Sequence, residues 1–161
     1  MVKLAEKYGA SVEAELGYVA KLGQSTKTIG FTEPSEAKLF VEETGVNALA
    51  VAIGSAHGFY KEEPKLDLER LSEIRNVTNA ALVLHGASGI PHDTLRKAIQ
   101  RGICKINLAT EIKNIFMKTL KNKLLNEDEI DLRKVFPCAT NAVTELVKDK
   151  LLAIQIENAT K

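Results

Sequence analysis

The segment AALVLHGASGIPHDTLRKAIQRGICKINLATE, residues 80–111, decides the fold class of this chain. It opens with an apolar run, Ala80–Gly86, that is rich in aliphatic residues and ends in a glycine, as buried strands do. Helical spacing of apolar residues follows over His92–Arg101, and a second aliphatic run occupies Ile103–Ala109. A strand, a helix and a second strand in this order indicate the βαβ unit of a parallel sheet.

The same alternation continues on both sides of this segment and predicts an α/β fold with four parallel strands. Two earlier strands are expected at Ser11–Gly17 and Ala48–Gly54, and loops at Gly23–Thr32 and Ser55–Lys65. One earlier helix is expected to begin at Pro34 and to end before Gly45, its stop signal, and another is expected to begin at about Leu68. Downstream, we expect a long helix to about Leu125, a turn at Asn126–Asp131 and a helical tail.

Composition narrows the function classes. The 161 residues include 22 basic and 21 acidic side chains spread along the chain, so no basic stripe predicts binding to nucleic acid. No apolar run approaches the roughly 20 residues that cross a bilayer, and the first residues lack a signal sequence, so a cytoplasmic protein without membrane contact is expected. Cys104 and Cys138 are far apart and are expected to be ordinary buried or half-buried thiols.

Two histidines follow predicted strands, and each directly precedes a glycine. His57 stands in Ser55-Ala-His-Gly58, and His85 stands in Leu84-His-Gly86. Either one alone is more typical of a structural hydrogen bond. Because the ends of parallel strands meet at one rim, the pair favours a shared site in which neutral imidazoles bind one metal. His92 lies in the first turn of a helix and is expected at the surface.

Two glycine- and hydroxyl-containing segments suggest an anion site. Gly86-Ala-Ser-Gly89 leads from a strand into a helix, and Asn107-Leu-Ala-Thr110 does the same one unit later. Backbone N–H groups and hydroxyls near positive helix ends are suited to phosphate. The alternative is that Ser88 and Thr110 merely cap helices.

Two carboxylates alternate with apolar residues in the first predicted strand. Glu13 and Glu15 therefore project from the same face of the sheet. Carboxylates that point into a barrel need a metal ion, a role as a base or a cationic partner to offset desolvation. A salt bridge to a lysine is an equally good interpretation.

These motifs, taken together, resemble those of the class II aldolases, which cleave fructose 1,6-bisphosphate or tagatose 1,6-bisphosphate. The resemblance rests on VEAELG and on the motifs AIGxAHGxY, LHGxSGIP and KxNxATE in this order, and it weakens after Leu125. It implies the C-terminal half of a (β/α)8 TIM barrel, strands five to eight plus C-terminal helices, with residues 1–161 as one partial barrel domain lacking the N-terminal half.

The resemblance also implies ligands, a reaction and site residues. His57 and His85 would be two of the three histidines that hold the catalytic zinc, with Glu15 beside the metal. The reaction would be zinc-dependent aldol cleavage to dihydroxyacetone phosphate and glyceraldehyde 3-phosphate, with a monovalent cation near the phosphate. The phosphate and the dihydroxyacetone end of the substrate would contact Gly58, Gly86, Ala87, Ser88, Asn107, Leu108, Ala109 and Thr110.

The sequence departs from the family pattern in two places. The aspartate that transfers a proton and the third zinc histidine belong to the N-terminal half, so no catalytic residue is assigned in this chain. The family's acidic loop with a catalytic glutamate corresponds to Tyr18–Thr32, which contains no acid.

Half a barrel is expected to leave two strand edges and an apolar inner face open to water, and so to form a homo-oligomer or to bind a complementary N-terminal half. One alternative is a noncatalytic phosphate-binding subunit that associates with a partner aldolase. Another is a small open α/β sheet for an unrelated phosphate ligand.

Overall fold

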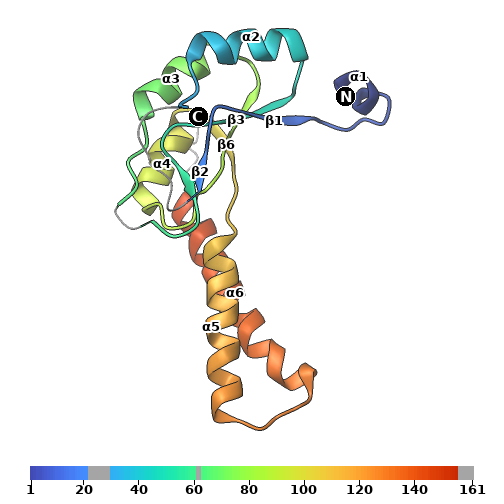
Figure 1. The fold of residues 1–161 in the computed structure, drawn as a ribbon, viewed down its shortest axis with the longest axis vertical. Helices are drawn as coiled ribbons and strands as arrows, with labels where there is room; N and C mark the ends of the chain where they lie inside the picture. Colours follow the sequence, from blue (N-terminus) through green and yellow to red (C-terminus); the bar gives the residue numbers. More distant parts are fainter. Residues whose placement is uncertain (22–29, 61–62, 156–161) are drawn as a thin grey trace, which may run out of the picture.

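The computed structural model describes residues 1–21, 30–60 and 63–155, and its central element is a four-stranded parallel sheet (Figure 1). The strands are β1 (Glu13–Leu16), β3 (Ala48–Val51), β5 (Ala81–Leu84) and β6 (Ile103–Ile106), in that spatial order. A shorter parallel ladder joins β2 (Ala20–Lys21) to β4 (Ala56–His57). The predicted α/β class with a parallel sheet is confirmed.

Helices separate these strands as the sequence predicts. They are α1 (Val2–Glu6), α2 (Pro34–Thr44), α3 (Leu68–Val77), α4 (His92–Gln100), α5 (Thr110–Asn126) and α6 (Leu132–Ile154). Helix α2 begins at Pro34 and ends at Gly45, whose φ of 69° is the left-handed conformation that stops a helix. Most of the loop expected at Gly23–Thr32 lies outside the described residues. None of the described helices is long and apolar enough to cross a membrane.

The core lies between the sheet and helices α2, α3 and α4. Strand β3 turns Leu49 and Val51 toward these helices, and Leu49 is paired with Leu82 of β5, so their side chains share this face. The helices contribute fully buried apolar residues to the same cluster: Ala37, Leu71, Ile74, Leu95 and Ala98. Each fully buried leucine or isoleucine contributes about 1.5–3 kcal/mol.

The opposite, inner face of the sheet carries charge. Register pairs Glu13 with Ala48 and Glu15 with Ala50, so both carboxylates stand on one face with the small side chains of β3. Ala50 and its partner Val83 on β5 are buried, so the expectation of an apolar inner face open to water is wrong for these strands. On this face the inner strands carry apolar side chains that are already buried, and the edge strand β1 adds acids instead of aliphatic residues.

Strand β6 contains a β-bulge at Cys104. Leu82 pairs with Ile103, whereas the next residue, Val83, pairs with Lys105, so Cys104 is the extra residue. Its thiol is exposed and donates to the carbonyl of Gly102 at 3.3 Å, so the expected burial of this cysteine is wrong. Cys138 is half-buried, as expected.

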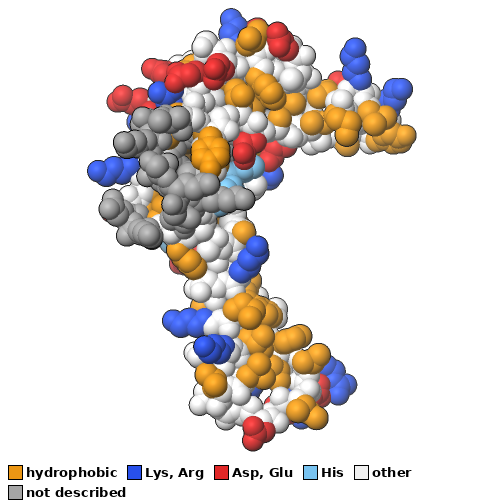
Figure 2. Space-filling view, viewed as in Figure 1, with side chains coloured by type: hydrophobic (Ala, Val, Ile, Leu, Met, Phe, Trp, Pro, Cys, Tyr) orange, Lys and Arg blue, Asp and Glu red, His pale blue; other side chains and the backbone are white. Residues whose placement is uncertain are grey.

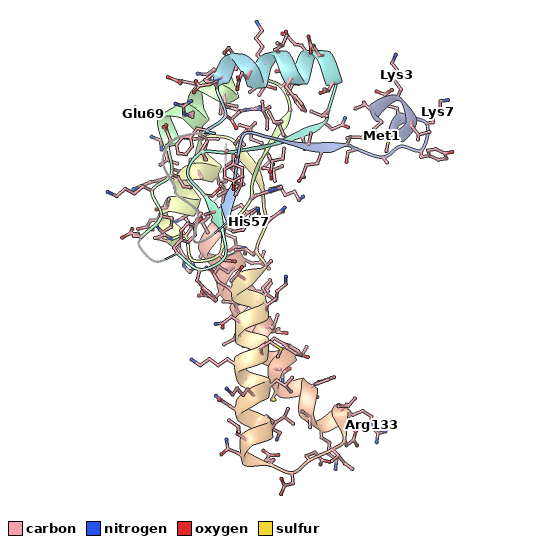
Figure 3. The ribbon with its side chains drawn as sticks, in the orientation of Figure 1. Met1, Lys3, Lys7, His57, Glu69 and Arg133 are labelled. Atoms are coloured by element: carbon pink, nitrogen blue, oxygen red, sulfur yellow. The ribbon has the colours of Figure 1, made fainter. Side chains whose placement is uncertain are left out.

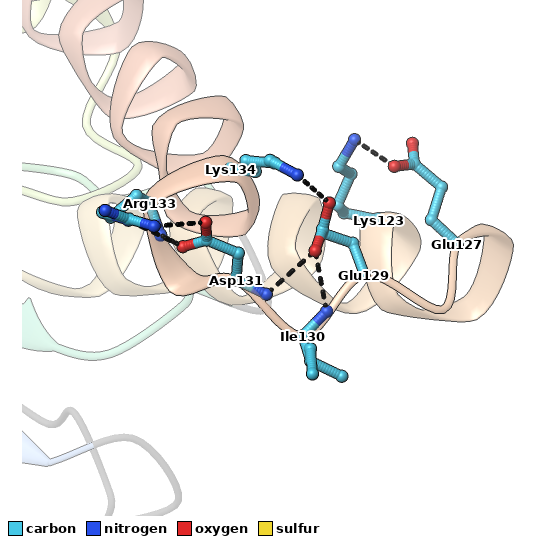
Figure 4. A network of polar contacts seen from close by, with 7 residues as sticks. All are labelled: Lys123, Glu127, Glu129, Ile130, Asp131, Arg133 and Lys134. Atoms are coloured by element: carbon cyan, nitrogen blue, oxygen red, sulfur yellow. Dashed lines mark hydrogen bonds and ion pairs between the residues drawn. The ribbon is translucent and has the colours of Figure 1, made fainter.

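Helices α5 and α6 form a hairpin that extends from the α/β body (Figure 1). Figure 2 shows apolar side chains along it, and α5 has no buried residue. At the tip, the Glu129 carboxylate accepts N–H bonds from Ile130 and Asp131 and pairs with Lys134 at 2.9 Å (Figure 4). Asp131 caps α6 by accepting from the N–H of Arg133.

Candidate metal and phosphate site

Three side chains from three parts of the fold converge above the inner face of the sheet. Glu15 comes from β1, His57 from β4 and His85 from the residue after β5. One ligand atom of each lies within 4.8 Å of the others, and the two imidazole centroids are 6.2 Å apart. Figure 3 shows His57 within the α/β body, far from the extension that carries α1. The structure thus brings together the three residues that the sequence analysis assigned to a metal.

The His85 ring lies between two carboxylates. Its Nδ1 is 2.6 Å from Oε2 of Glu15, and its Nε2 is 3.2 Å from Oε1 of Glu13. The second oxygen of Glu13 accepts from Nζ of Lys105 at 2.7 Å. Each interpretation of the paired carboxylates therefore fits one of them. Glu13 forms the salt bridge to a lysine, and Glu15 belongs to the candidate metal group.

The charge of Lys105 acts on Glu13. Its hydrogen bond, followed by that of His85, holds the pKa of the Glu13 carboxyl below its ordinary value, against a raising effect of burial. Glu13 is therefore an anion at neutral pH. Neither Glu13 as a partner of His85 nor Lys105 as its counter-charge was identified from the sequence, because the strands that carry them lie at opposite edges of the sheet.

Tyr60 joins the two loops that carry the histidines. Its hydroxyl accepts from the N–H of Ala56 at 2.7 Å and donates to the carbonyl of Gly86 at 2.8 Å. Burial raises the pKa of this phenol, which keeps it protonated and able to donate. A side chain at Gly86 would place a Cβ 2.5 Å from the Ala56 carbonyl oxygen, so only glycine permits this approach.

The predicted phosphate segments are also brought side by side. The N–H of Asn107 donates to Leu84 at 2.9 Å, and the N–H of Ala87 donates to the carbonyl of Asn107 at 3.3 Å. Gly58 follows His57 directly and is half-buried, as is Gly86. Leu108 packs against the core, whereas Ala109 is exposed. These bonds connect the loops after β5 and β6 into one surface.

Helix α5 is capped from the neighbouring loop. The Oγ of Ser88 accepts from the N–H of Glu111 at 3.3 Å. Thr110, by contrast, is the first helical residue, and the N-cap position is Ala109, which has no side chain able to cap. The Glu111 carboxylate accepts from the N–H of Gly89 and pairs with Lys150 at 2.9 Å. The interpretation that these hydroxyls merely cap helices therefore fits Ser88, which accepts a bond from the first turn of α5, but does not fit Thr110. Glu111 was not identified from the sequence, since its partners lie 22 and 39 residues away.

His92 and Ser55 belong to neither the metal group nor the phosphate segments. His92 is partly exposed at the surface, as expected, and its Nε2 lies 3.7 Å from a carboxylate oxygen of Asp149. Ser55, between His57 and the end of β3, is buried, and its Oγ has no hydrogen-bond partner in the part of the chain that the structure describes.

A parallel α/β sheet with a group of histidines and a carboxylate at its strand ends defines a partial (β/α)8 barrel with a candidate metal site. The model of the class-II fructose-bisphosphate aldolase family matches residues 1–159. The chain therefore belongs to the class II fructose-bisphosphate aldolase family, as its motifs indicated.

Solved structures of aldolases share this fold. The chain is similar to the YdjI aldolase from Escherichia coli K12, with 34% identity over 99% of this chain and a TM-score of 0.80. It is also similar to a putative fructose-1,6-bisphosphate aldolase from Coccidioides immitis, with 29% identity over 95% of this chain and a TM-score of 0.82. In both cases the chain spans 55% of the relative's length.

A third solved structure is similar to this chain in its fold only. This is the fructose-bisphosphate aldolase from Campylobacter jejuni, with 18% identity over 95% of this chain and 53% of that chain, and a TM-score of 0.71.

Proposed function

We propose that this chain supplies one part of a zinc-dependent aldolase site that cleaves a ketose 1,6-bisphosphate, fructose or tagatose, to dihydroxyacetone phosphate and glyceraldehyde 3-phosphate. The observation that carries the proposal is the convergence of Glu15, His57 and His85 in a chain of the class II aldolase family. Two imidazoles and a carboxylate form a donor set used by catalytic zinc, which keeps a further position open for substrate.

The geometry of the three side chains is compatible with zinc. Around a tetrahedral zinc ion, donor atoms lie about 3.4 Å apart, because each bond is roughly 2.0–2.2 Å long. The separation of up to 4.8 Å closes to this value by small rotations, and Glu15 and His57 are exposed enough to make them. When bound, zinc supplies a Lewis acid that polarises a ketose carbonyl.

The two connected loops after β5 and β6 are proposed to bind a substrate phosphate. Gly86, Ser88 and the segment 107–110 lie at the N-terminal end of α5, a 17-residue helix whose dipole favours an anion. The Ser88 oxygen accepts a bond from the backbone, so its own O–H remains able to donate to a phosphate oxygen. A monovalent cation beside that phosphate belongs to the same proposal.

The other part of the site is proposed to come from outside these 161 residues. Because the chain spans 55% of its solved relatives, we propose that the proton-transferring aspartate and a third histidine are contributed by the N-terminal half of the barrel, in the same or another polypeptide. The edges of β1 and β6 are the surfaces that such a half, or a second copy of the chain, would pair with.

Zinc titration tests the metal part of the proposal. We expect the chain to bind zinc, and expect His57→Ala and His85→Ala each to weaken binding by at least about tenfold, since zinc normally takes three protein ligands or more. His92→Ala is the matched control, because that imidazole faces Asp149 at the surface and is expected to leave zinc affinity unchanged. Equal affinity in all three variants would exclude the site.

A retro-aldol assay tests the reaction. Release of triose phosphate from fructose and tagatose bisphosphates is measured with zinc, for the chain alone and with a complementary N-terminal half taken from the Escherichia coli relative. Cleavage is expected only with both halves. Zinc binding without cleavage in any combination favours the noncatalytic phosphate-binding subunit instead.

A further inference from the structure

We propose that Glu13 is a positioning residue that holds His85 through its Nε2–H, so that Nδ1 faces the metal position shared with Glu15 and His57. This inference rests on the proposed zinc site and adds to it a residue outside the ligand group. It begins with the His85 ring, each of whose nitrogens lies within hydrogen-bonding distance of a different carboxylate.

The two nitrogens of His85 have different surroundings. Nδ1 lies 2.6 Å from Glu15, which belongs to the candidate metal group, whereas Nε2 lies 3.2 Å from Glu13, which does not. A metal binds the nitrogen that has no proton, and the proton then resides on the other ring nitrogen. With the metal beside Nδ1, the proton is on Nε2, and this N–H donates a hydrogen bond to the Glu13 carboxylate.

Lys105 holds the Glu13 carboxylate in place. Its Nζ lies 2.7 Å from Oε2 of Glu13, so the other oxygen, Oε1, is directed at the imidazole. The chain of contacts from Lys105 through Glu13 to His85 links β6 to β1, the two outer strands of the sheet. An exposed lysine–carboxylate pair contributes little stability, so a role in orientation explains this one better than a role in folding.

Carboxylates behind metal-binding histidines fix the tautomer and the ring orientation, and their loss typically weakens metal binding by about 10–100-fold. The other contacts of the half-exposed His85 ring are to Glu15, at 2.6 Å, and to the His57 ring, and both of these residues belong to the candidate metal group. Without Glu13, the ring can rotate about its side-chain bonds and the proton can occupy either nitrogen. Both changes lower the fraction of the chain that is ready to bind metal.

Substitutions at Glu13 test this role by zinc affinity, measured in competition with a coloured chelator. Glu13→Leu removes the acceptor and is expected to weaken zinc binding by about 10–100-fold. Glu13→Gln retains an acceptor oxygen without the charge, so its affinity is expected between those of Glu13→Leu and the unchanged chain. Lys105→Met is expected to have a smaller effect than Glu13→Leu. Glu36→Gln, an exposed carboxylate on α2, is the control.

The tautomer of His85 provides a readout that a purely structural role would not change. In the zinc-loaded chain, nitrogen-15 correlation spectra are expected to show His85 with its proton on Nε2, and Glu13→Leu is expected to reduce that population while thermal unfolding changes little. If the unchanged chain binds no zinc, this inference and the proposed function both fail. If it binds zinc through His85 but affinity and tautomer are unaffected by Glu13→Leu, only this inference is overturned.

Discussion

The two faces of the central sheet are built from the same four strands but differ in almost every property. On the outer face, Leu49, Leu82 and their neighbours are fully buried against helices. On the inner face, Glu13 pairs with Lys105, and Glu13 and Glu15 each contact a nitrogen of His85. Because strand side chains alternate, one sequence can specify a packed layer and a charged site independently. Stability is therefore expected to depend on one face and ligand binding on the other.

The largest effect is expected from the outer face. Leu82→Ala removes a fully buried side chain and is expected to lower the free energy of unfolding by about 2–5 kcal/mol. Urea denaturation measures it. Leu124→Ala, at a half-exposed position on α5, is the matched control, with an expected change within about 0.5 kcal/mol. Equal losses would mean that the outer face is not the source of stability.

A smaller effect on stability, with a clear effect on the site, is expected from Ala50→Leu. Ala50 pairs with Glu15 on one side and Val83 on the other, and it is fully buried. A leucine there is expected to cost about 1–3 kcal/mol through overpacking and to push Glu15 away from His85. Thermal unfolding and zinc titration measure the two effects. Ala10→Leu, at an exposed position, serves as the control, and unchanged zinc affinity in Ala50→Leu would contradict the proposed geometry.

A substitution in the α5–α6 hairpin tests whether the stability of the sheet is independent of the hairpin. Asp131→Ala removes the cap of α6 and is expected to speed hydrogen exchange in the first turn of that helix, with little effect on the sheet. The hydrogen bond from Arg133 lowers the pKa of Asp131, so its contribution is present above the ordinary value of 3.8 and is lost as the pH falls below it. A protection factor, the exchange rate corrected for its intrinsic pH dependence, that stays constant as the pH falls below 3.8 would argue against the cap.

The smallest effect is expected at Ser55. Its buried hydroxyl has no partner among the described residues, so Ser55→Ala is expected to leave the free energy of unfolding unchanged or to raise it by less than about 1 kcal/mol. A calorimetric loss of stability would show instead that the hydroxyl makes a bond with a group outside the described residues.

Much of the fold was predictable from local patterns. Aliphatic runs bounded by glycine predicted the four strands, and Pro34 and Gly45 predicted the start and end of α2. The approach of His57 and His85 followed from the rule that parallel strands end at one rim. These features depend on residues close together in the sequence, or on a topology that leaves few choices.

The missing features depend on register between distant strands. Period-two alternation placed Glu13 and Glu15 on one face. It could not show that Lys105 pairs with Glu13 or that His85 contacts both acids, since those partners are 70 to 92 residues away. The partners of Tyr60 were missed for a different reason, because a side chain that bridges two loops leaves no periodic pattern.

The bulge at Cys104 gives the inner face one of its charges. A regular strand would continue the alternation from Ile103 without interruption, so Lys105 would point toward the helices and Ile106 toward the acids. Straightening the strand while Cys104 is retained would thus place a cation in the hydrocarbon layer and an aliphatic group on the side of the acids. A related sequence with one residue fewer at this point is expected to keep the lysine on the inner face in a regular strand, because loss of Cys104 restores the alternation.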